Sequence, residues 1–151
     1  MQNILKKVGL PLMIIGSLTA AVFSQAANPV NTAAADAVRS SPAFAEVLLK
    51  RTELESELES LLLDYTDEYP RVKEIRYSLT VLKRDMDKIA ATKPADTGKL
   101  TLALGKLMIK RMELETDLWE LLQTYKDEHP DVKRAKRRVE IYDRAIKEIT
   151  G

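Results

Sequence analysis

The chain has 151 residues, of which 45% are hydrophobic and 31% charged, and its 24 basic and 23 acidic residues leave it nearly neutral. It contains no cysteine, which excludes disulfides, thiolate metal sites and thiol nucleophiles. Aromatic residues make up only 5% of the chain, whereas Leu, Ala, Glu, Lys and Arg are frequent, a composition typical of long helices. We therefore expect an all-α protein that is stabilised by packing alone.

The first 26 residues have the pattern of an export signal. Lys6 and Lys7 precede an apolar run over 8–22, and small residues up to Ala26 offer a cleavage site. The run has 15 residues, fewer than the about 20 that a membrane span needs. We predict a cleaved signal peptide over 1–26 and a periplasmic or secreted protein without a membrane span, whose net charge changes from +1 to −1 on cleavage. A retained N-terminal anchor helix is the alternative.

A direct repeat at a spacing of 60 residues organises the rest of the chain. Residues 41–90 align without a gap onto residues 101–150, and 17 of the 50 pairs are identical. This predicts a first repeat over 41–91, a linker over 92–99 and a second repeat over 100–151. The segment 27–40 holds mainly small residues without an apolar stripe, which predicts a flexible mature N-terminus.

Each repeat is predicted to be a pair of helices joined by a short turn. Ser41 and Pro42 form a helix-start pattern, and Pro70 both ends the first apolar pattern and suits the start of the next helix. Asp96 or Thr97 is expected to cap the first helix of the second repeat. The second helix of each pair carries a coiled-coil seam with spacings of three and four, at Val72, Ile75, Leu79, Leu82, Met86 and Ile89, and again at Val132, Ala135, Val139, Tyr142, Ile146 and Ile149.

The short turns require the two helices of each pair to be antiparallel neighbours. The predicted fold is therefore two tandem antiparallel helical hairpins, which either close as an up-down-up-down four-helix bundle or stay open and meet partner chains. The turn itself is predicted to be built by packing of residues kept in both copies, Tyr65 and Pro70 in the first and Tyr125 and Pro130 in the second. The acidic residues around it are explained by caps and by the helix dipole, so we expect no metal there.

Arg51 and Arg111 occupy the position that interrupts the apolar row in the first helix of each repeat. One interpretation is a buried ion pair with Glu55 or Glu115, one turn further on, which would set helix register at some loss of stability. The other is an arginine whose aliphatic stem packs while its guanidinium reaches water. The sequence leaves both open.

Two features are confined to the second repeat. One is a cationic run on the outer face of the last helix, which either binds an anionic partner such as an acidic polysaccharide or lipid head groups, or is simply solvated. It consists of Lys133, Arg134, Lys136, Arg137 and Arg138. The other is Trp119, which replaces Glu59 of the first copy and is either a partner contact or packed under the linker. Export and the lack of interleaved aromatic residues argue against nucleic acid.

Nothing in the sequence pairs a nucleophile with a base, since cysteine is absent and the one histidine, His129, has Tyr69 as its counterpart in the first copy. Glycine is too scarce for a phosphate-binding loop. We expect no enzyme activity and no cofactor. The predicted function is that of an exported, non-catalytic structural or interaction module of the bacterial cell envelope, with self-association or another envelope protein as its partner. The alternative is a periplasmic protein that holds unfolded clients, like a chaperone, or acidic glycans.

The turn and its flanks resemble the periplasmic coiled-coil segment of the polysaccharide chain-length determinant proteins, also called polysaccharide co-polymerases. The resemblance is carried by Leu121, Leu122, Tyr125, His129, Pro130 and Val132, and by Leu61, Leu62, Tyr65, Tyr69, Pro70 and Val72. It implies a shared hairpin, an envelope setting and a link to polysaccharide assembly or export. The paired membrane spans and α/β base domain of that family have no counterpart in this sequence, so control of polymer length is not implied.

Overall fold

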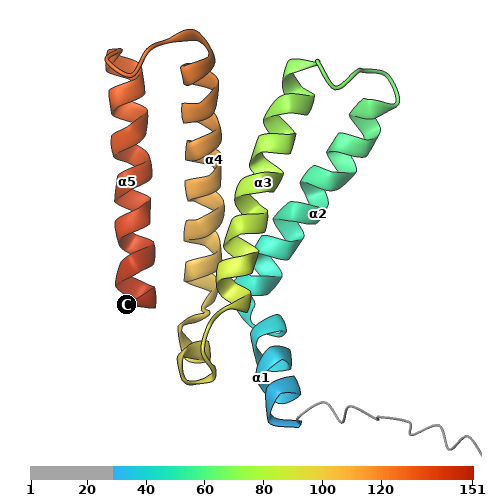
Figure 1. The fold of residues 1–151 in the computed structure, drawn as a ribbon, viewed down its shortest axis with the longest axis vertical. Helices are drawn as coiled ribbons and strands as arrows, with labels where there is room; N and C mark the ends of the chain where they lie inside the picture. The colour runs from blue at the N-terminus through green and yellow to red at the C-terminus, as the bar shows by residue number, and fades with distance from the viewer. Residues whose placement is uncertain (1–28) are drawn as a thin grey trace, which may run out of the picture.

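The computed structural model of the protein describes residues 29–151, and within them it is all-α, as the composition predicts (Figure 1). The predicted signal segment 1–26 lies outside the described residues. In chain order the helices are α1 (Pro29–Arg39), α2 (Pro42–Leu62), α3 (Pro70–Ala90), the 3-10 helix η1 (Pro94–Lys99), α4 (Leu102–Thr124) and α5 (Pro130–Thr150). The helices α2 and α3 form the first hairpin, and α4 and α5 form the second.

Local sequence signals account for most of the helix ends. The Ser41 hydroxyl accepts a hydrogen bond from the Phe44 amide at 3.3 Å, which satisfies one of the free amides at the start of α2. Prolines begin α3 and α5, as the repeat predicts. The prediction for α4 is wrong, because Asp96 and Thr97 lie inside η1 and Thr101 is the cap, accepting from the Leu104 amide at 3.3 Å.

The segment 27–40, predicted to be flexible, contains α1. Proline stands at its first position, and alanine, which has the highest helix propensity, supplies four of its eleven residues. Val38 anchors it, because this residue is only 5% exposed and belongs to the core of the hairpins. The sequence lacks a clear apolar stripe over 27–40, which is why the pattern does not predict this helix.

The four long helices alternate in direction but do not close into a ring. The two hairpins meet at their base and diverge towards their turns, so that the molecule is V-shaped (Figure 1). Helix α4 packs against α2, α3 and α5, whereas within residues 29–151 the extended contacts of α5 are with α4. The arrangement is therefore a three-helix unit of α2, α3 and α4, with α5 added on the far side of α4.

A glycine permits the close approach of α4 to α2 at the base. A Cβ atom at Gly105 would lie 2.9 Å from the Cβ of Glu46 and 3.0 Å from the Cα of Ala43. These atoms belong to or adjoin the backbone of α2, so they cannot move aside as a flexible side chain would. The absence of a side chain at Gly105 thus sets the distance between the two hairpins.

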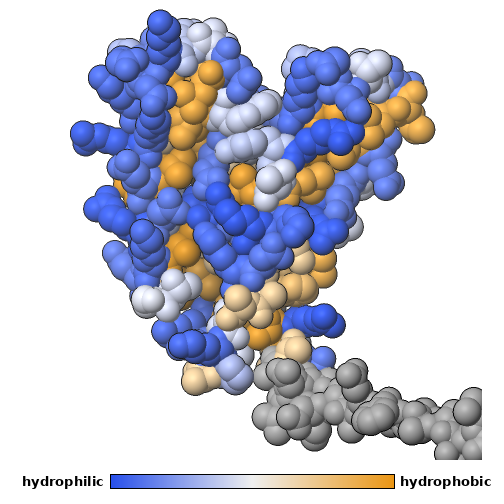
Figure 2. Space-filling view, viewed as in Figure 1, coloured by the Kyte–Doolittle hydropathy of each residue, from blue (hydrophilic) through white to orange (hydrophobic). Residues whose placement is uncertain are grey.

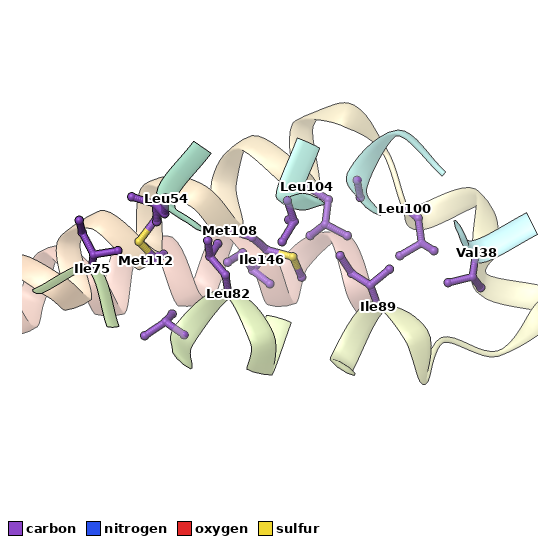
Figure 3. Close-up of a cluster of buried hydrophobic side chains, with 13 residues drawn as sticks. Val38, Leu54, Ile75, Leu82, Ile89, Leu100, Leu104, Met108, Met112 and Ile146 are labelled. Carbon is purple, nitrogen blue, oxygen red and sulfur yellow. The ribbon is translucent and has the colours of Figure 1, made fainter. Parts of the chain in front are cut away.

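The core follows the predicted seams. Ile75, Leu82 and Ile89 of the α3 seam are 1% exposed or less, and Ile146 of the α5 seam joins the same cluster (Figure 3). Residues of α4 fill the space between the hairpins, with Leu104, Met108 and Met112 buried. The outer surface is mostly hydrophilic, with hydrophobic atoms between α4 and α5 and near the top of α2 (Figure 2). Among the helices described, none combines the length and the apolar character needed to span a membrane.

Candidate functional site

The junction between the hairpins holds a buried ionic network. Arg111 on α4 is 4% exposed and Asp85 on α3 is fully buried, and the Arg111 guanidinium donates a hydrogen bond to the Asp85 carboxylate. A second donor, Nη1, reaches Oδ1 of Asp143 on α5 at 2.8 Å. Glu115, one turn further along α4, lies 3.6 Å from the Arg111 Nε and accepts from Arg84 Nη2 at 2.8 Å. One arginine therefore ties three helices together.

Burial alone would lower the pKa of Arg111, but the hydrogen bonds to Asp85 and Asp143 outweigh it and hold this pKa above its ordinary value. The network is not fully satisfied, because Asp85 Oδ2 and Arg111 Nε have no hydrogen-bond partner within residues 29–151. A buried charge with an unpaired atom is expensive unless its neighbours compensate it. The pair is thus a structural device that depends on both partners.

Arg51, the counterpart of Arg111, is in a different environment. Its side chain is 42% exposed, and its Nε donates to Glu55 Oε1 of the same helix at 2.7 Å. The two carboxylates that pair with Arg111 have no equivalent in the other repeat, because Ala145 is the counterpart of Asp85 and Lys83 is the counterpart of Asp143. Arg111 is therefore the buried arginine, but its hydrogen-bonded partners are Asp85 and Asp143 rather than the predicted Glu115. Arg51 is half-exposed and forms the predicted pair with Glu55.

Trp119 lies at the same junction, where its ring stacks on Tyr77 of α3 with the centroids 5.1 Å apart. Beside this stack, the hydroxyls of Ser78 and Thr116 form a buried hydrogen bond of 2.9 Å between α3 and α4. Burial, with a smaller contribution from Glu115, raises the pKa of Tyr77. Trp119 thus contributes to the packing between the hairpins, and its half-buried ring also lines a cleft with Pro70, Lys73 and Gln123.

The cationic run does not form one uninterrupted patch. Two of its members are paired with acids of the preceding turn, Arg134 with Asp131 and Lys136 with Asp127 at 2.8 Å. The Arg134 guanidinium accordingly lowers the pKa of Asp131. Among the described residues, Lys133, Arg137 and Arg138 form no ion pair, and all three are exposed. The free positive charge is therefore concentrated on these three residues.

The two turns share a stacked pair of rings. Tyr65 stacks on Tyr69 and Tyr125 stacks on His129, each with ring centroids 4.1 Å apart. His129 takes the place of its counterpart Tyr69 in this stack, so either ring fills the position before the proline. His129 adds a cap, since its Nδ1 accepts from the Asp131 amide at 3.2 Å.

These turns place acidic residues beside basic ones of the following helix. In the first turn, Asp67 pairs with Arg76 at 2.5 Å and Glu68 pairs with Lys73. Together with the ion pairs of the second turn, these contacts engage the acidic residues locally. The stacked rings and ion pairs therefore hold the two helices of each hairpin at the turn.

Comparison with protein-family models, with curated proteins and with solved structures finds no match for this chain. The likeness to chain-length determinants therefore remains an expectation that rests on the turn residues alone.

Proposed function

We propose that this protein is an exported, non-catalytic interaction module of the bacterial cell envelope. The observation that carries the proposal is that the buried charges are paired with each other. Arg111 and Asp85 are the buried ionisable residues among those described, and they neutralise each other at the hairpin junction. Such a pair holds helices in register and has no free group that could act on a substrate. The molecule therefore offers faces of helices, and its partner is a second copy or another envelope protein.

The export-type N-terminus and the likeness to chain-length determinants support an envelope setting, with polysaccharide assembly or export as the associated process. The test is to fractionate cells that make the protein, to sequence its N-terminus and to cross-link it in place. We expect processing after Ala26, recovery from the envelope and a cross-linked product with a second protein chain. A full-length product confined to the cytoplasm, or one never cross-linked to any chain, would refute the proposal.

A second candidate function is binding of an acidic glycan, which is favoured by the exposed Arg137 and Arg138, neither of which forms an ion pair with another described residue. Alginate, a polymer of uronic acids, is a suitable probe. Replacement of Lys136, Arg137 and Arg138 by alanine should then abolish binding to immobilised alginate, and replacement of Lys93, Lys126 and Lys147 should leave it intact. Equal binding by the two triple variants would exclude this function.

A further inference from the structure

The inner junction is made by one particular face of α3. While the α3 seam packs on α2, a second face of the helix packs on α4. Four contacts define this face. They are the stack of Tyr77 on Trp119, the hydrogen bond between the hydroxyls of Ser78 and Thr116, and the ion pairs of Arg84 with Glu115 and of Asp85 with Arg111. Val81 lies among them and is 3% exposed.

The same positions of α5, 60 residues later, form a largely exposed face, at whose edge Arg138 also lines a cleft with Asp117 and Glu120 of α4. These positions are Arg137, Arg138, Ile141, Arg144 and Ala145. Ile141, which corresponds to the buried Val81, is 53% exposed. The α5 face is thus a basic surface with an isoleucine at its centre, and we call it the α5 outer face.

The complementary half of the junction also has an uncovered counterpart. The α4 residues that receive α3 include Met108, Met112, Glu115, Thr116 and Trp119, and their counterparts on α2 are Leu48, Thr52, Glu55, Ser56 and Glu59. Met108 is 3% exposed, whereas Leu48 is 40% exposed. We call these α2 residues the α2 outer face, and they carry two glutamates. Four of the five are exposed, whereas Glu55 is half-buried and also lines a cleft with Leu79 and Lys83 of α3.

Two of the three arginines of the α5 outer face have a glutamate of the α2 outer face at the matching position. Where the inner junction pairs Arg84 with Glu115, the outer faces offer Arg144 and Glu55. Where it stacks Tyr77 on Trp119, they offer Arg137 and Glu59, a second pair of opposite charge. The exposed Ile141 would meet Leu48 and Thr52 between these pairs. An aromatic stack inside the molecule is thus replaced by an ion pair at the position where two separate molecules would meet.

We propose that a second copy of this chain docks the α2 outer face on the α5 outer face of the first, head to tail, and so repeats the inner junction between molecules. The proposal rests on the interaction function given above and names its partner and its surface. Pairing of like faces is disfavoured, since α5 against α5 would oppose arginines and α2 against α2 would oppose glutamates. A head-to-tail contact uses different surfaces on the two copies, so it extends into short open chains rather than closing as a dimer.

Two positions indicate that the contact between molecules is looser than the inner junction. The counterpart of Gly105 is Ala45, whose Cβ keeps the neighbouring helices further apart. The counterpart of Asp85 is Ala145, so that Arg51 receives no second carboxylate and stays paired with Glu55. The contact therefore depends on surface ion pairs and a small apolar centre, and we expect reversible association with a Kd on the order of 10 micromolar, weakened by salt.

The test is sedimentation velocity of the protein as recovered from the cells that make it, over about 1 to 100 micromolar. The variants are Arg137→Glu on the α5 outer face and Glu59→Arg on the α2 outer face. Each alone should weaken association by about tenfold or more, because it opposes like charges. Lys126→Glu and Glu128→Arg make the same charge changes at exposed turn positions and should leave association unchanged.

Restoration of opposite charges gives the decisive measurement. An equimolar mixture of the two single variants, and the double variant with both changes, should associate as the unaltered protein does. Association lost with Arg137→Glu but unaffected by Glu59→Arg would instead indicate that the α5 outer face meets a surface other than the α2 outer face, and it would overturn the proposal. Association that none of these variants changes, or a monomer throughout the range, would also overturn it. If cross-linking in cells joins the protein to a different protein, the proposed envelope function stands even when self-association fails these tests.

Discussion

Arg111 and Arg51 allow the buried network to be tested inside one molecule, because the repeat places the same residue in two environments. In Arg111→Met, buried Asp85 loses its hydrogen-bonded counter-charge and keeps only Arg84, whose Nε lies 3.8 Å from Asp85 Oδ1, while Asp143 loses its partner. Removal of one member of a buried ion pair destabilises a protein by about 3–5 kcal/mol. In Arg51→Met, only a half-exposed pair with Glu55 is lost, and such pairs within a helix contribute about 0.3–0.5 kcal/mol.

The expected difference of about 3 kcal/mol is more than a hundredfold in the folding equilibrium. Urea unfolding at a few micromolar measures it, followed by helical circular dichroism and by the fluorescence of Trp119, which lies at the same junction. The free energy of unfolding should fall much more in Arg111→Met, with little change in its dependence on urea. Equal losses in the two variants, within about 0.5 kcal/mol, would refute the role assigned to the network.

The double variant Asp85→Ala with Arg111→Met separates the ion pair from general packing. Because it removes both buried charges, it should be more stable than the sum of the two single losses predicts, by about 1–3 kcal/mol. Asp85→Ala alone should be the milder single change, since Arg111 keeps Asp143 and Glu115 as neighbours. Strict additivity of the two changes would mean that the charges do not depend on each other.

Three further predictions concern other parts of the junction. Gly105→Val should lower the free energy of unfolding by about 2 kcal/mol, because the added side chain forces α4 away from Ala43. Gly98 has open space around it, so Gly98→Val should change this free energy little. Equal losses in the two variants would contradict the close approach of α4 to α2. Burial and the nearby Glu74 and Asp117 raise the pKa of Glu120, so its contribution to stability is present below its ordinary pKa and lost as the pH rises through the raised value. Glu120→Gln should therefore stabilise the protein by a few tenths of a kcal/mol at pH 7 and not at pH 4, and an equal effect at both values would contradict this. Tyr77→Ala should shift the Trp119 emission to longer wavelength and lower stability by about 1–2 kcal/mol, while Tyr65→Ala in the turn should leave the emission unchanged.

The elements that the sequence predicts correctly are those encoded by neighbouring residues. Ser41, Pro70 and Pro130 act within one helical turn of themselves, and the seams of α3 and α5 repeat at short spacing. Helix α1 could not be predicted from neighbouring residues, because its position depends on the contact of Val38 with residues of distant helices. Thr101 caps α4 because Asp96 and Thr97, the residues predicted to cap it, lie inside η1.

The environment of Arg111 could not be deduced from its own helix. Its partners Asp85 and Asp143 lie 26 and 32 positions away, in the two helices that flank α4. A signal for them does exist in the repeat, because the first copy has Lys83 where the second has Asp143, and the second has Ala145 where the first has Asp85. Such reciprocal changes become informative only when the order of the helices in space is known.

That order also explains how the two copies differ. Helix α3 lies between two helices, and its second face carries Ser78, Val81 and Asp85, which a buried junction accepts. Helix α5 has α4 on one side only, and the matching positions are Arg138, Ile141 and Ala145. If solvation alone had shaped this face, the charges on α2 would bear no relation to it. Glutamates at the α2 positions that would oppose Arg137 and Arg144 therefore favour a docking surface over a merely solvated one.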